Sequence, residues 1–313
     1  MPLDPQIAHF LAKTAGAAAP ASLFEMRAAA ETGLLALQGE SEPSGGVRDG
    51  RVTADDGHQI AIRAYWPAGV AMGKPIPAML YAHGGGWCLG SLALYDLPCQ
   101  ALANATGRVI LSVDYRLAPE HPYPRPLEDL YQALCAVVDR AEQWGIDATH
   151  MAVGGDSAGG NLAAAVALLA RDRNGPGIEH QLLLYPALSR AMDTASYQAY
   201  AQGYFLTKEV MEFCWGQYLV EGEDKPDPYA QPLHAETLRQ LPSATILSCE
   251  YDPLRDEAEH YAQRLREDGV AVRCERLPGM VHACIHMLGL TPAARLLFDK
   301  AAERGRSNVF AET

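Results

Sequence analysis

Residues Met151–Gly160 read MAVGGDSAGG, and this stretch decides the fold. The apolar run at its start predicts a buried strand, and the alanine-rich run that follows, Ala158–Arg171, predicts a helix. Ser157 lies at the turn between this strand and this helix, flanked by Gly155 and Gly159. Side chains at these two glycine positions would collide with neighbouring backbone. Such a turn presents Ser157 as a candidate nucleophile, beside the amino terminus of a helix.

The turn has two other interpretations. A phosphate-binding loop would need a lysine where Gly160 stands, and the chain contains no G-x-G-x-x-G. A tight glycine turn without chemistry remains the structural alternative, and the position between a strand and a helix disfavours it.

Working outward, short apolar runs alternate with helical patterns. The expected strands are Ile60–Trp66, Pro77–Ala82, Val109–Val113, Met151–Val153, Gln181–Tyr185, Ala244–Cys249 and Val270–Cys274. The expected helices are Leu92–Thr106, Pro126–Gln143, Ala158–Arg171, Pro253–Asp268 and Pro292–Arg304. Buried strands that alternate with helices predict an α/β fold with a mostly parallel central sheet and helices on both faces. In such sheets the active site lies at the carboxyl ends of the strands.

Two stretches stand outside this alternation. Residues 5–38 have a helical pattern, with a capping box at Ser22 and Glu25, and a Gly/Ser/Glu-rich break, Gly39–Gly50, follows them. Residues 190–225 are helical without a compact crossover between strands. Both stretches together could form a helical cap over the strand ends, although 190–225 could also be an insertion packed on the rim. The expected division is 1–45 as amino-terminal cap helices, 46–189 and 226–313 as the core, and 190–225 as the cap insertion.

A second motif, His83–Trp87 (HGGGW), follows an expected strand. Three successive glycines allow backbone N–H groups to turn toward a substrate oxygen, as an oxyanion hole requires. We expect Gly84 and Gly85, with the N–H of Ala158, to form that hole, and His83 to fix the loop rather than to act in catalysis. The structural alternative is a flexible glycine loop.

The acid and the base should follow the serine along the chain, in that order. Asp252 comes directly after an expected strand, and His282 lies in an expected loop past the last strand. Asp256 falls one turn into a helix and suits a surface or capping role. His286 competes with His282, but we expect it to face away on a helix. A metal site at this histidine pair lacks an H-E-x-x-H motif and a nearby acidic ligand.

These segments together resemble the hormone-sensitive-lipase-like esterases, a branch of the α/β-hydrolases with HGGG and GDSAG motifs. Residues 114–122 (DYRLAPEHP), 252–256 (DPLRD) and 203–207 (GYFLT) resemble further family segments, the last of them in the cap. The resemblance implies hydrolysis of short- to medium-chain carboxylic esters through a serine acyl-enzyme, without a cofactor. It implies a triad of Ser157, Asp252 and His282, with Gly84 and Gly85 in the oxyanion hole. One departure is Ala283-Cys284, where family members usually carry Gly-Phe.

Four aromatic residues are candidates for the substrate pocket, because ester pockets are lined by apolar and aromatic groups: Trp87, Tyr185, Phe205 and Trp215. Packing in the core or in the cap is an equally good explanation for each of them.

Composition limits the partners. The formal net charge of -13, without a basic run, disfavours nucleic acid and stable membrane association. Seven cysteines without C-x-x-C spacing suit reduced thiols and, with no signal-peptide pattern, a cytoplasmic location. The expected partner is a small ester, with no metal, and a homodimer is left open. Two functional alternatives remain: an arylformamidase or related amide hydrolase, and a non-catalytic binding protein like the plant hormone receptors that resemble this family but lack the histidine.

Overall fold

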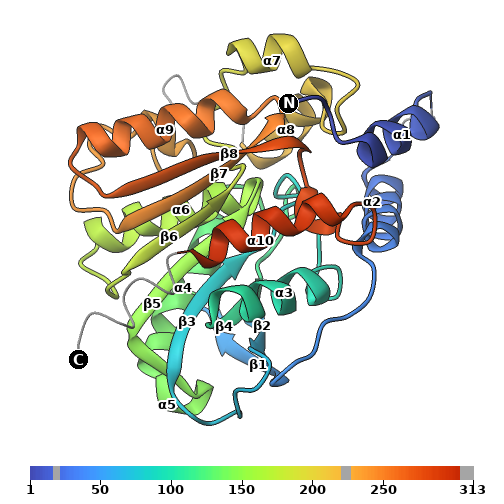
Figure 1. Cartoon of the computed structure of the whole chain (residues 1–313). Helices are drawn as coiled ribbons and strands as arrows, with labels where there is room; N and C mark the ends of the chain where they lie inside the picture. Colours follow the sequence, from blue (N-terminus) through green and yellow to red (C-terminus); the bar gives the residue numbers. More distant parts are fainter. Residues whose placement is uncertain (17–21, 220–226, 304–313) are drawn as a thin grey trace.

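The computed structural model describes residues 1–16, 22–219 and 227–303, which build one eight-stranded sheet covered by helices (Figure 1). The strand order is β1-β2-β4-β3-β5-β6-β7-β8. Every neighbouring pair from β4 to β8 is parallel, and β2 runs antiparallel to both β1 and β4. The predicted mostly parallel α/β sheet is therefore confirmed.

The strands are β1 Gly46–Thr53, β2 Gln59–Trp66, β3 Ile76–Ala82, β4 Val109–Asp114, β5 Ile146–Asp156, β6 His180–Leu184, β7 Ser243–Tyr251 and β8 Val272–Val281. The α-helices are α1 Pro5–Thr14, α2 Leu23–Gln38, α3 Asp96–Thr106, α4 Arg125–Asp139, α5 Ala141–Trp144, α6 Ala158–Asp172, α7 Ala195–Tyr200, α8 Lys208–Tyr218, α9 Arg255–Glu267 and α10 Arg295–Ala302. Short 3₁₀ turns occupy η1 Pro232–His234, η2 Cys284–His286 and η3 Pro292–Ala294.

Side-chain alternation along the strands divides the core between the two faces of the sheet. On β3, Ala78, Leu80 and Ala82 pack on the face covered by α4, α6 and α9. Met79 and Tyr81 point to the other face, where α3 and α10 pack. β3 is therefore apolar along its whole length, which is why it appears in the sequence as a continuous apolar run.

Several predicted boundaries move. The expected break at Gly39–Gly50 already contains the start of β1, whose alternating exposed residues give no continuous apolar run. β5 and β8 extend well beyond the short runs that predicted them, because backbone pairing with a neighbouring strand continues through polar residues. Residues 17–21, 220–225 and Arg304, which fall in expected helical or cap segments, lie outside the described residues. In the described part of 5–38, Ser22 caps α2 by accepting the N–H of Glu25.

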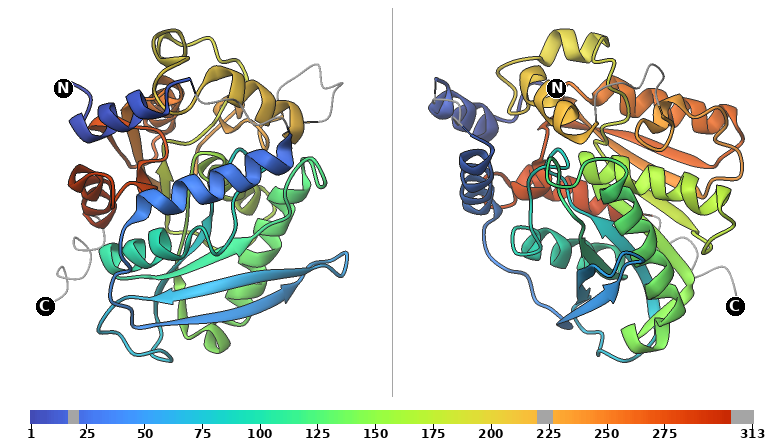
Figure 2. Two further views of the ribbon diagram at one scale, coloured as in Figure 1. Left: turned by 90° about the vertical axis from the view of Figure 1, so that its right-hand side faces the viewer. Right: turned by 180° about the vertical axis from the view of Figure 1, so that it is seen from behind.

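The helices outside the alternating pattern gather at one end of the sheet. α1 and α2 precede the first strand, and α7 and α8 follow β6, yet Figures 1 and 2 show all four on the side of the molecule where the loops after β3 and β5 emerge. Gly289 donates its N–H to the carbonyl of Leu37, which ties the end of α2 to the segment after β8. At this end of the sheet, segments that are far apart in the sequence lie close enough together to form one site.

Candidate active site

Ser157 occupies the sharp turn between β5 and α6. Its backbone has φ 55° and ψ -120°, a left-handed conformation that costs free energy in a residue with a Cβ. Two hydrogen bonds hold the turn: the Ser157 N–H donates to Leu184 O (2.9 Å), and the Asn161 N–H donates to Ser157 O (3.0 Å). At Gly159 a Cβ would collide with the carbonyl oxygen of Ala82, so only glycine allows α6 to approach β3 this closely.

Asp252 and His282 reach the same point from two other strand ends. Asp252 follows β7 and His282 follows β8. His282 Nε2 lies 2.9 Å from Ser157 Oγ, and His282 Nδ1 lies 2.7 Å from Asp252 Oδ2. All three side chains are almost fully buried, at 7 % exposure or less. With the ring proton on Nδ1 donated to the carboxylate, Nε2 is free to accept the serine proton.

Neighbouring groups fix the orientation of this chain of hydrogen bonds. The second carboxylate oxygen of Asp252 accepts the Leu254 N–H at 2.9 Å, so the carboxylate cannot swing away from the imidazole. The ring of Tyr185 packs edge-on against the ring of His282, with centroids 4.8 Å apart. Asp256, the alternative acid, instead accepts the Ser196 N–H at 2.7 Å in the first turn of α7.

His286 does not face away as the sequence suggested. It lies on η2, is buried, and lines the same cavity as His282. Its Nδ1 accepts the side-chain amide of Gln38 (2.8 Å), and the ring packs edge-on against Tyr95. Burial lowers the pKa of His286 to about 3, so its ring is neutral at physiological pH. Among the residues that the structure describes, no group of three or more His, Cys, Asp or Glu could hold a metal.

The structure contradicts the assignment of Gly84 to the oxyanion hole. The Gly84 N–H is already shared between Asp156 Oδ1 and Tyr95 Oη, both at 2.9 Å. Within the described ranges, the N–H groups of Gly85 and Gly86 meet no acceptor. Gly85 has φ +120° and Gly86 has φ +59°, so the loop turns its backbone after Gly84. The sequence could not show where along HGGG that turn begins.

Asp156, directly before Ser157, holds the amino-terminal end of the glycine loop at Gly84. Its carboxylate accepts three donors: Tyr81 Oη, Tyr95 Oη and the Gly84 N–H, each at 2.9 Å. Full burial raises the pKa of Asp156 to about 6, although the hydroxyl donors of Tyr95 and Tyr81 work in the opposite direction. The sequence gives no sign of this role for Asp156, because it depends on the two tyrosines that the fold places around the carboxylate.

His83 fixes the loop from the other side, as expected. Its Nδ1 donates to Gly84 O at 2.8 Å, and the ring stacks on Tyr115 with centroids 4.4 Å apart. Burial lowers the pKa of His83, which favours the neutral ring.

A largely apolar cavity of about 510 Å³ opens above Ser157 and His282. Its walls come from four parts of the chain: the amino-terminal helices, the glycine loop, the segment from Phe205 to Cys214, and the segment after β8. The side chains that form its apolar walls include Phe10, Leu34, Leu37, Leu89, Leu94, Phe205, Leu206, Val210 and Met211.

Of the four aromatic candidates, Phe205 lines the cavity, whereas Trp87, Tyr185 and Trp215 are not among its lining residues and are fully buried. Trp87 stacks flat on Tyr218 (4.3 Å, 4°) and packs against Trp215 (4.4 Å), so these rings join α8 to the glycine loop. The sequence missed the aliphatic wall. Leu206, Val210 and Met211 are spaced like one helix face, a pattern that core packing explains equally well.

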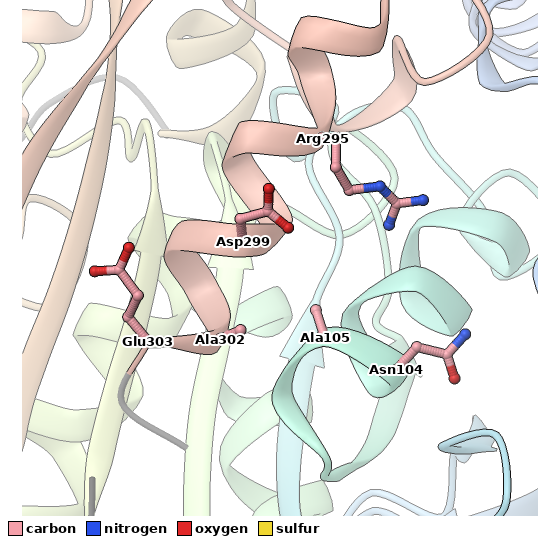
Figure 3. A pocket seen from close by; sticks show the side chains of 6 residues that line it. All are labelled: Asn104, Ala105, Arg295, Asp299, Ala302 and Glu303. Atoms are coloured by element: carbon pink, nitrogen blue, oxygen red, sulfur yellow. The ribbon is translucent and has the colours of Figure 1, made fainter. Parts of the chain in front are cut away.

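A second depression of about 430 Å³ lies between α3 and α10 and is lined by Asn104, Ala105, Arg295, Asp299, Ala302 and Glu303 (Figure 3). Arg295 pairs with Glu42, and Glu303 pairs with Lys300. No serine, cysteine or histidine lies among its lining residues.

No helix of the described part of the chain is both long and apolar enough to cross a membrane.

Comparisons with known proteins identify the family of the chain. A family model described as "alpha/beta hydrolase fold" matches residues 79–286. The carboxylesterase NlhH of Mycobacterium tuberculosis is 40 % identical over 239 residues, which cover 75 % of this chain and 74 % of that protein. An ethyl acetate hydrolase of Pseudomonas putida is 33 % identical over 296 residues, covering 92 % and 93 %. The crystal structure of a hyperthermophilic esterase from Pyrobaculum calidifontis superposes with a TM-score of 0.91 at 36 % identity, covering 98 % and 99 %.

Proposed function

Because the chain belongs to the α/β-hydrolase family, we propose that it is a serine carboxylesterase in which Ser157, His282 and Asp252 form the catalytic triad. One observation carries the proposal: Ser157 Oγ, His282 and Asp252 are joined by hydrogen bonds of 2.9 and 2.7 Å beneath an apolar cavity. The resemblance to hormone-sensitive-lipase-like esterases implies the same triad.

The geometry supports a two-step acyl transfer. Ser157 Oγ attacks the ester carbonyl while His282 Nε2 takes its proton, and Asp252 stabilises the imidazolium that forms. The tetrahedral intermediate collapses when His282 returns the proton to the leaving alcohol, which leaves an acyl group on Ser157. Water then repeats the sequence with His282 as base, releases the acid and restores the serine.

The oxyanion is assigned to the N–H groups of Gly85, Gly86 and Ala158. Ala158 begins α6, so its N–H lies at the positive end of the helix dipole. Gly86 replaces Gly84 in this assignment because the Gly84 N–H is held by Asp156 and Tyr95. Removal of a single donor from such a hole costs about 3–4 kcal/mol of transition-state stabilisation in other hydrolases.

The substrates are short- to medium-chain carboxylic esters. A cavity of about 510 Å³ with mainly aliphatic walls suits one modest alkyl or aryl arm on each side of the carbonyl. The relatives named carboxylesterase and ethyl acetate hydrolase support this class.

We also keep the proposed division of the chain, in which residues 1–45 and 190–225 cap a core made of 46–189 and 226–313. Its support is that side chains of α1, α2 and α8 contribute to the walls of the cavity. A cytoplasmic location without stable membrane association is proposed on the charge of -13 and on seven cysteines that are all free.

Hydrolysis of p-nitrophenyl esters from acetate to palmitate, by wild type and S157A, tests the proposal. We expect clear activity on short chains that declines toward long ones, and a loss of about 10⁵- to 10⁶-fold in the variant. Formanilide in the same assay tests the amidase alternative, which would be favoured by faster cleavage of the amide. An inactive wild type, or an S157A variant with the full rate, would refute the proposal.

A further inference from the structure

One side chain of the amino-terminal segment reaches the glycine loop. Arg27, on the second turn of α2, donates from Nε to Cys88 O at 2.8 Å and from Nη2 to Ala118 O at 3.1 Å. The same guanidinium makes a two-pronged ion pair with Glu120, both contacts being 2.7 Å. Four N–H groups of one planar guanidinium thereby bind two different segments, at Cys88 and at 118–120.

The carbonyl that Arg27 holds belongs to the turn that carries Gly85 and Gly86. The N–H groups of Cys88 and Leu89 both donate to Gly85 O, at 3.1 and 2.8 Å. Gly86 therefore lies inside a turn that Cys88 closes, and the position of the Cys88 peptide determines where the N–H groups of the turn point. At its other end the loop is fixed by the Gly84 N–H on Asp156.

The second carbonyl strengthens the same attachment. The Ala118 N–H donates to Trp87 O at 2.9 Å, so the segments 87–88 and 118–120 are already paired through their backbones. Arg27 binds one carbonyl from each of them and Glu120 as well. Arg27 therefore attaches this pair of segments to α2, and Glu31 of the same helix accepts Ser91 Oγ at 3.0 Å a little further along the chain.

The ion pair alone does not explain the arrangement. The side chains of Arg27 and Glu120 are 32 % and 54 % exposed, and surface ion pairs contribute little to folding stability. A guanidinium that only fastened α2 would not need to donate to two backbone carbonyls of the glycine loop and its neighbour. Because Arg27 fixes the positions of these carbonyls, it also fixes the direction of the N–H groups of Gly85 and Gly86.

We propose that Arg27 is a positioning residue for the oxyanion hole, which it holds through the carbonyl of Cys88. The inference rests on the proposed function of the Gly85 and Gly86 N–H groups. It gives α2 a second role beyond forming a wall of the cavity, because the rate of acyl transfer then depends on a residue far upstream of the triad.

The test compares R27Q and R27K with R173Q. Arg173 makes a similar two-pronged pair with Glu128, and its side chain is 43 % exposed. It follows the carboxyl end of α6, about 24 Å along that helix from Ser157. R173Q therefore removes an equivalent ion pair without touching the site. For each variant we would measure kcat and KM for p-nitrophenyl butyrate, the inhibition constant of an alkyl trifluoromethyl ketone, and Tm.

A positioning role predicts a split between kcat and KM. In R27Q we expect kcat to fall by about tenfold to a hundredfold, the range expected when a reacting geometry is displaced, with KM within about twofold. The ketone forms an oxyanion on Ser157, so its inhibition constant should rise by the same factor as kcat/KM falls. R27K should recover part of the rate, because an ammonium can reach one carbonyl but not both. R173Q should leave kcat unchanged.

Other outcomes would overturn the inference while leaving the esterase activity in place. If the decreases in Tm and in kcat were no larger in R27Q than in R173Q, Arg27 would contribute only a surface ion pair. If R27Q raised KM alone, α2 would act only as a wall of the cavity. A wild type without esterase activity would instead remove the proposed function itself, which this series detects in its first measurement.

Discussion

The buried carboxyl of Asp156 should make the stability of the protein depend on pH in a specific direction. Its pKa is raised from 3.8 to about 6 because burial disfavours the charged form. The folded state thus holds this proton more tightly than the unfolded chain does. The contribution of Asp156 to stability is complete below pH 3.8 and is lost as the pH rises through about 6.

The two pKa values determine the size of the effect. Between pH 5 and 7.5, ionisation of Asp156 should lower the free energy of unfolding by about 1 kcal/mol. D156N carries no titrating group at this position and retains an oxygen that can accept the Gly84 N–H. Urea unfolding of wild type and D156N at both pH values isolates the contribution of Asp156. The change in the free energy of unfolding between the two pH values is compared for the two proteins, so titrations that both proteins share cancel.

A second variant tests the cause of the shift. Tyr95 donates to Asp156 Oδ2, and this hydrogen bond favours the ionised carboxylate. Y95F should therefore raise the pKa of Asp156 further and increase the loss of stability between pH 5 and 7.5. The reasoning fails if the difference between wild type and D156N is the same at both pH values.

Two further predictions concern catalysis and substrate choice. D252N should lower kcat by about 10⁴-fold with little change in Tm, because the amide favours the wrong tautomer of His282. Steady-state kinetics and thermal unfolding check this prediction. A kcat within tenfold of the wild-type value would contradict it. Gly33 lies on α2 at the cavity wall, with no atom within 4 Å of a Cβ built there, so G33L should fit and shift the preference toward shorter esters. Gly216 on α8 is equally open but does not line the cavity, so G216L is the control. Two series of esters, one varied in the acyl chain and one in the alcohol, show which arm of the substrate is affected. An unchanged chain-length preference in G33L would contradict the prediction.

The sheet could be predicted because its central strands are buried on both faces and therefore read as continuous apolar runs. β1 could not, since it is an edge strand with alternating exposure. For the site, the order of strand ends was enough to name Ser157, Asp252 and His282, which the structure brings within hydrogen-bond distance of one another.

Residues whose role depends on three-dimensional neighbours were less accessible to prediction. Gly84 was misassigned because its N–H partner, Asp156, lies on another strand. Trp87 and Trp215 looked like pocket aromatics, yet a large ring serves equally well in packing, and here the two rings pack against each other. Nothing in the composition of α2 indicated that Arg27 would reach the loop after β3.

One wall of the cavity and the groups proposed for bond cleavage come from different stretches of the gene. The family model begins at residue 79, whereas Phe10, Leu34 and Leu37 precede it. Recombination that exchanged the first 45 codons between relatives would therefore replace one side of the cavity and leave the triad intact. Such chimeras would inherit new substrate ranges in a single event, on the condition that the incoming segment brings an arginine able to meet Cys88.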